Sequence, residues 1–179
     1  MTDTLEFCPV LDHLDRVAAP VAAALSGLDP ADAATVQVAE IDPAAADTAT
    51  FCTRYGVAPQ ASANCVVVKG RRDGADRHAA CVVLATTRAD VNGLVRRHLD
   101  VRKLSFAALD EAVALTGMQY GGITAIGLPP SGPVLVDGAV TMLTAVLMGS
   151  GLRSSKLLVP GRLLERLPGV QILEGLGNA

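Results

Sequence analysis

Two glycine-rich stretches carry the residue types in this chain that are best suited to binding chemistry. The first, TGMQYGGITAIGL at residues 116–128, places Gly121 and Gly122 before a short apolar run that Gly127 closes. The second is GSGLRSSK at residues 149–156. Glycine lets backbone N–H groups turn outward and approach a ligand without a Cβ in the way. Taken alone, the first stretch also fits a helix cap followed by a turn, so its meaning depends on the rest of the chain.

The second stretch resembles nucleotide-binding loops only in part. A P-loop needs a glycine directly before its lysine and a helix after it, whereas Ser155 precedes Lys156 and the strand-like LLVP follows. A dinucleotide-binding reading of Gly149 and Gly151 fails for the same reason, because no helix N-terminus follows to hold a pyrophosphate. Both nucleotide motifs are therefore poor fits.

The sequence offers no recognisable nucleophile–base pair or metal-ligand motif. The histidines His13, His78 and His98 form no HxxxH or HxxE pattern. The four cysteines include no CxxC pair, and Cys65 and Cys81 lie in apolar runs where a small buried thiol is the ordinary explanation. The sequence therefore predicts no metal, no cofactor and a reduced, cytoplasmic protein.

Length and composition favour one domain over residues 1–179. Half of the residues are hydrophobic, yet aromatic residues make up 3% and tryptophan is absent, so the core must consist of Ala, Val and Leu. Such a core suits a compact α/β fold. No apolar run approaches the roughly 18 residues of a membrane span. The N-terminal MTDTLEFCPV is acidic, which is not typical of a secretory signal.

The net charge of −3 hides an uneven distribution. Residues 1–68 carry two basic and nine acidic side chains, whereas residues 69–103 carry nine basic and four acidic ones. A local basic excess favours contact with a phosphate backbone. Arginine and lysine are also the usual solvated cover of a helix or hairpin, so charge alone leaves both interpretations open.

Hydrophobic spacing and turn residues outline interleaved helices and strands. Several strands are joined by tight turns, so the sheet is expected to be mixed. Residues 140–148 are expected to end as a strand, and Ser105 is the expected N-cap of the helix that follows it. The expected helices cover residues 11–27, 44–55, 90–99, 106–116 and 161–167, and the other strands cover residues 36–41, 61–70, 78–86, 101–104, 133–137, 156–160 and 170–173.

Several separated motifs occur in an order typical of one family. GV-x-P precedes a strand, and a hairpin, a helix, TG-x-x-x-GG-x-x-x-x-G, LVD and GSG-x-R-x-x-K follow. This order resembles the YbaK/ProX aminoacyl-tRNA deacylases, free-standing relatives of the editing domain of bacterial prolyl-tRNA synthetases. The resemblance covers residues 36–174 and leaves residues 1–35 as an N-terminal helical extension. It implies an α/β (α+β) fold with a mixed, barrel-like sheet flanked by helices.

The resemblance also implies a function, namely editing in trans by hydrolysis of the ester in mischarged tRNA, such as alanine or cysteine on tRNA for proline. The implied catalytic positions are Gly121, Gly122 and Asn64. Backbone N–H groups of the glycine loop hold the ester oxyanion, one such donor being worth roughly 3–4 kcal/mol, and Asn64 holds the terminal ribose or phosphate. The attacking group is water, a substrate thiol or a ribose hydroxyl. The implied substrate-binding residues are Ile123, Thr124, Gly127, Asp137, Gly149, Ser150, Gly151, Arg153 and Lys156, and the implied tRNA contacts are Lys69, Arg71, Arg72, Arg96 and Arg97.

Two positions depart from the family pattern. Asn64, in NCVVV, stands where family members usually have a lysine, and a carboxamide donates hydrogen bonds but carries no charge. Ala125 replaces a proline common in the first glycine loop. Two alternatives therefore stay open beside the deacylase: a non-catalytic homologue that binds tRNA or a synthetase, and a small-metabolite-binding module.

Overall fold

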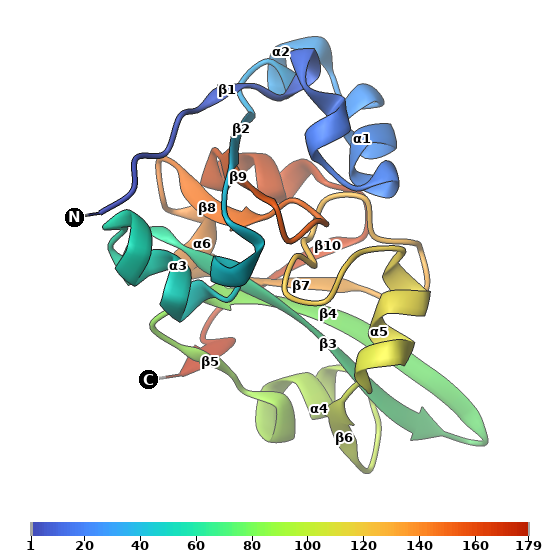
Figure 1. Cartoon of the computed structure of the whole chain (residues 1–179). Helices are drawn as coiled ribbons and strands as arrows, with labels where there is room; N and C mark the ends of the chain where they lie inside the picture. The colour runs from blue at the N-terminus through green and yellow to red at the C-terminus, as the bar shows by residue number, and fades with distance from the viewer. Residues whose placement is uncertain (1, 179) are drawn as a thin grey trace.

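A computed structural model of the chain describes residues 2–178, in which the strands form three sheets (Figure 1). The four-stranded sheet has the order β1-β2-β9-β8, the five-stranded sheet β10-β7-β4-β3-β6, and the two-stranded sheet β11-β5. The strands are β1 (Cys8–Pro9), β2 (Gln37–Glu40), β3 (Ala63–Arg72), β4 (Ala75–Leu84), β5 (Arg88–Ala89), β6 (Leu104–Phe106), β7 (Val134–Asp137), β8 (Val146–Gly149), β9 (Ser155–Val159), β10 (Val170–Leu173) and β11 (Gly177–Asn178).

The five-stranded sheet is built on the predicted β3–β4 hairpin. Its two central turn residues, Asp73 and Gly74, both have positive φ angles (51° and 81°), as a tight hairpin of this twist requires. β6 pairs antiparallel with β3, whereas β7 and β10 continue the sheet in parallel beyond β4. The mixed sheet flanked by helices is thus confirmed. The barrel-like closure is not, because each described sheet has two open edges.

Six α-helices flank the sheets within the described residues, and a π-helical turn over Val91–Val95 leads into the fourth. The helices are α1 (Ala19–Ser26), α2 (Pro30–Ala33), α3 (Thr48–Tyr55), α4 (Arg96–His98), α5 (Leu109–Thr116) and α6 (Gly138–Thr141), and 3-10 turns cover Val10–Asp12, Leu14–Arg16, Pro43–Ala45, Pro59–Ala61 and Gly161–Arg166. The predicted single helix over residues 11–27 is wrong. Because proline cannot occupy a helix interior, a new helix begins at Ala19 with Pro20 in its first turn, and the chain is extended at Val17.

The region before α5 also differs from its prediction. Ser105 is not a helix cap; it lies in β6 and pairs with Lys69 of β3. α5 begins only at Leu109, after Ala108 in an extended conformation. Pairing with the long β3 edge therefore prevails over the helical pattern of residues 106–108. As a result, Phe106 ends a strand, and it is 63% exposed.

The main core lies between the two larger sheets and α1. Val38, Met148 and Leu157 of one sheet meet Val82 and Val136 of the other. Residues before position 36 also belong to this core, although their predicted status as an extension stays a prediction. A second cluster covers the opposite face of the five-stranded sheet, and a third lies under α3.

Candidate functional site

A cavity of about 320 Å³ opens where the start of β3 meets the segment before α3 and the loop after α5. We call it the Lys156 cavity. β8 and β9 each contribute one residue to it, Gly149 and Lys156. The cavity thus joins four regions that are far apart in the sequence. Its lining residues are Ala46, Asp47, Thr48, Ala63, Asn64, Cys65, Val66, Val67, Phe106, Ala107, Ala112, Tyr120, Gly121, Ile123, Gly149 and Lys156.

The start of α3 fixes one wall of this cavity. Asp47 is the N-cap of α3, and its carboxylate accepts a hydrogen bond from the backbone N–H of Thr50 at 3.0 Å. Hydrogen bonds from Thr50, together with the nearby Lys156 ammonium, lower the pKa of Asp47. The hydroxyl of Thr48 donates to Oδ1 of Asn64. Because that oxygen already accepts a hydrogen bond, the side-chain NH₂ group of Asn64 remains as a donor for a ligand.

The edge of β3 forms the opposite wall. β6 pairs with β3 only at residues 68–70, and the N–H of Ala107 donates to the carbonyl of Val67 at 2.9 Å. Backbone groups of alternate residues along an antiparallel strand point to the same edge. Cys65 therefore directs its N–H and C=O toward this edge, beyond the end of β6. A backbone donor and a backbone acceptor lie side by side at the wall.

Lys156 lies at the base of the cavity and is only 6% exposed. Its Nζ donates to the carbonyl of Ala46 at 2.9 Å and lies 5.2 Å from the ring centroid of Phe51. Burial lowers the pKa of Lys156, and the charge of Asp47 opposes this effect. Within residues 2–178 it forms no salt bridge. An ammonium has three donors, so two remain for a group in the cavity.

The two glycine loops pack directly against each other beside this cavity. The carbonyl of Gly122 accepts from the N–H of Gly151 at 2.7 Å. A Cβ at Gly122 would lie 2.5 Å from the carbonyl oxygen of Leu152, and one at Gly149 would lie 2.3 Å from that of Gly122. The N–H of Gly122 donates to Gln119, which differs from the predicted oxyanion role. Gly121, with φ of 86°, is the glycine of this pair that lines the cavity.

The family assignment follows from the sequence of the region that builds this site. Residues 42–167 match the family model of the aminoacyl-tRNA editing domain. The chain belongs to this editing family. The match covers α3, the hairpin, both glycine loops and Lys156, so the predicted family is confirmed.

Solved structures support the fold of this editing domain at low sequence identity. A scaffold protein from computational epitope grafting has a TM-score of 0.73 and 20% identity over 90% of this chain and 97% of its own. A candidate trans-editing enzyme for prolyl-tRNA synthetase has a TM-score of 0.72 and 18% identity over 91% and 99%. The hypothetical protein APE2540 has a TM-score of 0.70 and 22% identity over 83% and 95%. The search of curated proteins gives no match.

Other predicted residues of the second loop shape the editing domain without lining the cavity. The hydroxyl of Ser150, fully buried, lies 2.7 Å from that of Ser155. Gly151 adopts φ of 84° where the loop turns. Arg153 donates to the carbonyls of Tyr120 (3.1 Å) and Pro43 (2.9 Å). Arg153 therefore ties the first glycine loop to the segment before α3.

Three more of the predicted substrate-binding residues, outside the second loop, do not line the cavity either. Asp137 caps α6 through the N–H of Ala139 and also accepts from the N–H of Gly177, so both of its carboxylate oxygens are hydrogen-bonded within the fold. A Cβ at Gly127 would meet the carbonyl of Pro20 at 2.4 Å, which explains a glycine there. Thr124 is fully buried, and its hydroxyl has no hydrogen-bond partner among the residues that the structure describes.

The predicted tRNA-binding residues fall into two sets. Lys69, Arg71 and Arg96 line a groove next to the Lys156 cavity, together with Arg102 and Lys103; we call this the basic groove. Arg72 and Arg97 do not line it, and Arg72 pairs with Asp73 and Asp100. Lys69 pairs with Glu111 at 2.6 Å and Asp76 at 3.0 Å, which raises its pKa.

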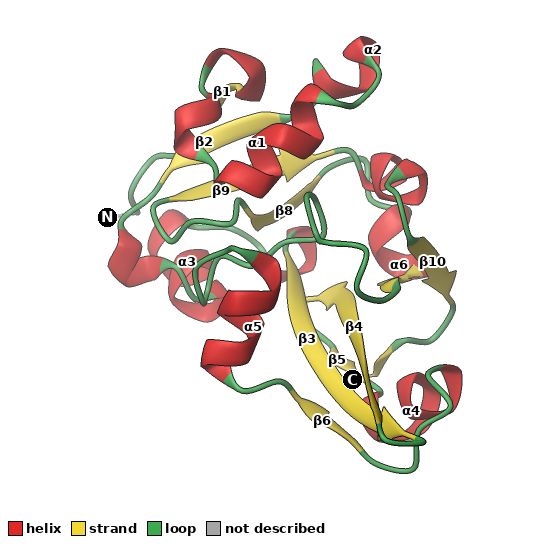
Figure 2. Cartoon of the chain, turned by 90° about the vertical axis from the view of Figure 1, so that its right-hand side faces the viewer, coloured by secondary structure: helices red, strands yellow, loops and turns green. Residues whose placement is uncertain are grey.

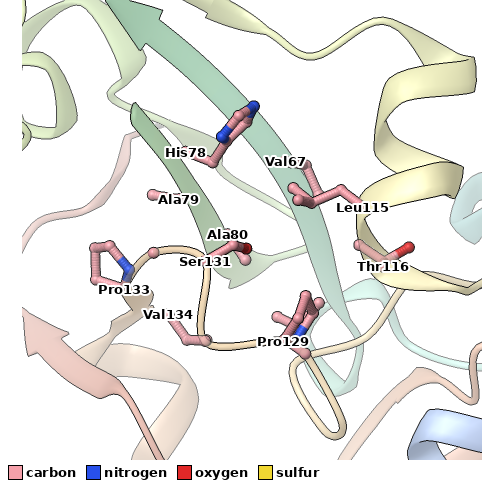
Figure 3. Close-up of a pocket in the computed structure, with 12 residues that line it drawn as sticks. Val67, His78, Ala79, Ala80, Leu115, Thr116, Pro129, Ser131, Pro133 and Val134 are labelled. Atoms are coloured by element: carbon pink, nitrogen blue, oxygen red, sulfur yellow. The ribbon is translucent and has the colours of Figure 1, made fainter. Parts of the chain in front are cut away.

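A second, smaller cavity lies on the other side of α5 (Figure 3). Leu115 and Thr116 of α5 face Val67 across it, and Pro129 and Ser131 close it from the loop before β7. Its volume of about 20 Å³ has room for one water. It is too small for an amino acid.

Among residues 2–178, no cluster of three or more His, Cys, Asp or Glu side chains is arranged to hold a metal ion. No helix of that part of the chain has the length and apolarity needed to cross a bilayer. Burial raises the pKa of Cys81 to about 12 and raises that of Cys65 further, so both thiols stay protonated at neutral pH.

Sequence reasoning missed two groups at the cavity. For Asp47 and Thr48 the sequence contained a local pattern, because an acidic residue directly before a helix is typical of an N-cap. Tyr120 and Phe106 carried a weaker one, the scarcity of aromatic residues in the chain. Neither signal specified a common cavity.

Proposed function

We propose that this protein is a trans-acting aminoacyl-tRNA deacylase of the YbaK/ProX type, which removes a wrongly attached amino acid from tRNA in the cytoplasm. The observation that carries this proposal is the buried, unpaired Lys156 at the base of a cavity walled by the first glycine loop. A buried cation without a carboxylate partner is costly, so it is expected chiefly where a ligand supplies the missing partner. The family assignment supplies the class of ligand.

In this proposal Lys156 replaces the family lysine that Asn64 lacks, acting from β9 instead of from β3. Water attacks the ester carbonyl, and its oxygen forms the new bond to carbon. The Lys156 ammonium stabilises the resulting oxyanion, helped by the NH₂ group of Asn64. The intermediate then collapses with cleavage of the bond to the ribose oxygen, which takes up the proton that the attacking water releases. The products are a free amino acid and tRNA with its terminal hydroxyl restored.

The lining of the cavity favours a small side chain on the substrate. Most of the apolar residues that line the cavity are small, among them Ala46, Ala63 and Ala112, and the cavity measures about 320 Å³. We therefore propose alanine or cysteine attached to tRNA for proline as the substrate. Each extra methylene that the site must reject is worth about 1–3 kcal/mol, so size alone gives moderate selectivity.

One observation favours a second candidate. Asn64 is hydrogen-bonded to Thr48 and carries no charge, as expected for a non-catalytic homologue that binds tRNA or a synthetase. A small-metabolite-binding module would use the same cavity. These candidates differ from the deacylase in whether free amino acid is released.

A deacylation assay on a panel of mischarged tRNAs separates these functions. The wild-type protein is expected to release alanine or cysteine faster than a bulkier amino acid such as phenylalanine. Asn64→Lys is the informative variant, because a homologue that has lost its catalytic lysine would gain activity from it. A wild type that binds every tRNA and releases nothing, beside an active Asn64→Lys, would establish the non-catalytic candidate.

A further inference from the structure

Aromatic residues are scarce in this chain, and their positions are uneven. There are three phenylalanines, two tyrosines and no tryptophan. Phe7, Phe51 and Tyr55 belong to the cluster under α3. The other two, Phe106 and Tyr120, are 63% and 56% exposed, and both line the Lys156 cavity. Three of the five aromatic side chains are thus packed in one cluster, with Phe51 buried and Phe7 and Tyr55 partly buried, whereas the two exposed ones share one opening.

Phe106 and Tyr120 are held at opposite ends of α5. β6 ends at Phe106 and leads through two residues into α5, as Figure 2 shows. Tyr120 follows α5, and its carbonyl accepts a hydrogen bond from Arg153 at 3.1 Å. Eight helical residues span about 12 Å, so the two rings stand apart along the cavity and do not stack on each other. Each ring has room for a separate flat partner.

The basic groove continues the cavity along the same two strands. The cavity reaches Val67 of β3 and Phe106 of β6, and the groove begins at the next paired residues, Lys69 and Ser105. Five cationic side chains line the groove against a single carboxylate, that of Asp76. Within residues 2–178, Arg96, Arg102 and Lys103 form no salt bridge. Unpaired cations next to exposed aromatic rings match a single-stranded nucleic acid, which presents phosphates and bare base faces together.

We infer that Tyr120 and Phe106 are stacking platforms for successive bases of a single-stranded RNA 3′ end, and that the phosphates before them follow the basic groove past Arg102 and Lys103. The inference rests on the proposed function for the class of ligand. Tyr120 takes the terminal base because it adjoins Gly121 and the amino-acid site, whereas Phe106 adjoins the groove. The RNA therefore enters along β6 and ends above Lys156.

Binding of uncharged RNA tests this path without any hydrolysis. The probe is a fluorescent RNA hairpin with a single-stranded 3′ ACCA end, compared with the same hairpin made blunt, by anisotropy at several salt concentrations. Phe106→Ala and Tyr120→Ala are each expected to weaken binding of the overhang hairpin about five- to one-hundred-fold, because stacking is worth about 1–3 kcal/mol per base. Binding of the blunt hairpin is expected not to change. Arg102→Gln is expected to lower the slope of log affinity against log salt by about one.

Exposed apolar residues outside the Lys156 cavity and the basic groove provide matched controls. Met142→Ala and Ile172→Ala remove side chains that are 76% and 37% exposed, and neither is expected to affect RNA binding. Phe106→Trp keeps an aromatic ring at this position, so it is expected to bind the overhang hairpin about as tightly as the wild-type protein does. The inference is overturned if the alanine variants bind the overhang hairpin as wild type does, or lose equal affinity for both hairpins. If the deacylase proposal alone is wrong, the hairpins will bind as expected, but no amino acid will be released from mischarged tRNA.

Discussion

Replacing Lys156 with methionine removes one charge from the base of the cavity and keeps most of the side-chain volume. If the ammonium stabilises the oxyanion, its loss resembles removal of a single oxyanion donor. Such a loss costs about 2.7–4 kcal/mol, so kcat is expected to fall roughly 100- to 1000-fold. Lys156→Arg keeps the charge but not its position, and an intermediate rate is expected.

Stability is expected to respond differently from activity. The variant leaves the carbonyl of Ala46 unpaired, which costs about 1–3 kcal/mol, and loses the contact with Phe51, worth about 1 kcal/mol. Against this, it no longer buries a cation, for which the penalty is several kcal/mol. The two effects nearly cancel. At about 2–4 °C per kcal/mol for a chain of this size, Tm is expected to stay within about 4 °C of wild type or to rise.

The lowered pKa of Lys156 gives an independent check. Between that pKa and the ordinary value of 10.5, the unfolded chain binds more protons than the folded one, so this group makes stability rise with pH. In Lys156→Met this contribution to the rise of the unfolding free energy with pH is expected to disappear. Denaturant unfolding of both proteins across this range measures it, and the difference cancels the cysteine titrations common to both.

Single-turnover deacylation rates, measured together with the Tm values, distinguish a catalytic role of Lys156 from a structural one. Arg162→Met, an exposed change outside the cavity, is the matched control for loss of a positive charge. A Lys156→Met protein that keeps half of the wild-type rate would refute the role of the ammonium. A fall in Tm of more than 10 °C would instead identify Lys156 as a structural residue.

Three further changes test the surroundings of the cavity. Thr124→Val replaces a buried, unpartnered hydroxyl with a methyl group and is expected to raise the free energy of unfolding by about 1 kcal/mol in urea. Gly149→Ala sets a Cβ 2.3 Å from a backbone oxygen and is expected to cost about 1–3 kcal/mol and slow deacylation. Hydrogen bonds from Lys69 and then His78 lower the pKa of Glu111 below its ordinary 4.5. Its stabilising contribution is therefore present above pH 4.5 and is lost as pH falls through the lowered pKa, so Glu111→Gln is expected to flatten the acid side of the stability curve.

Each of these changes has a contrary outcome. A less stable Thr124→Val would mean that the hydroxyl has a bound partner such as a water molecule. Gly169→Ala is the converse case, because its Cβ would meet nothing within 4 Å but the residue has a positive φ (75°), which Gly149 does not; it is expected to cost about 1–2 kcal/mol of backbone strain and to leave activity intact. An acid transition that is identical in Glu111→Gln and wild type would show that the ion pair contributes nothing to stability.

Local signals in the sequence were sufficient for most of the fold. The β3–β4 hairpin was legible because two apolar runs flank an Asp-Gly turn, and α3 was legible from its closing glycine, Gly56. The start of α5 was not, because pairing of Ser105 with Lys69 depends on a strand more than thirty residues away. Tertiary pairing decided that boundary.

The candidate site was predictable only where a motif named it. The glycine loops and Lys156 appeared in the motif order, and the cavity brings them together. Asp137 was predicted from its motif, whereas its place outside the cavity lining and its hydrogen bond to the N–H of Ala139 depend on the tertiary structure. Phe106 and Tyr120 belong to no motif, because their exposure at the same cavity opening depends on the tertiary structure.

The pairing of β2 with β9 has a consequence for how this protein is made. Val38 pairs with Leu157, 119 residues later, and Ala46 meets Lys156 over a similar span. At synthesis rates of about 5–20 residues per second, β2 waits roughly 6 to 24 s on the ribosome before its partner emerges. The hairpin can form during that delay, whereas the closing of so long a loop cannot. The Lys156 cavity is therefore expected to be among the last features to form, and a nascent chain arrested before β9 should already contain the hairpin but lack the cavity.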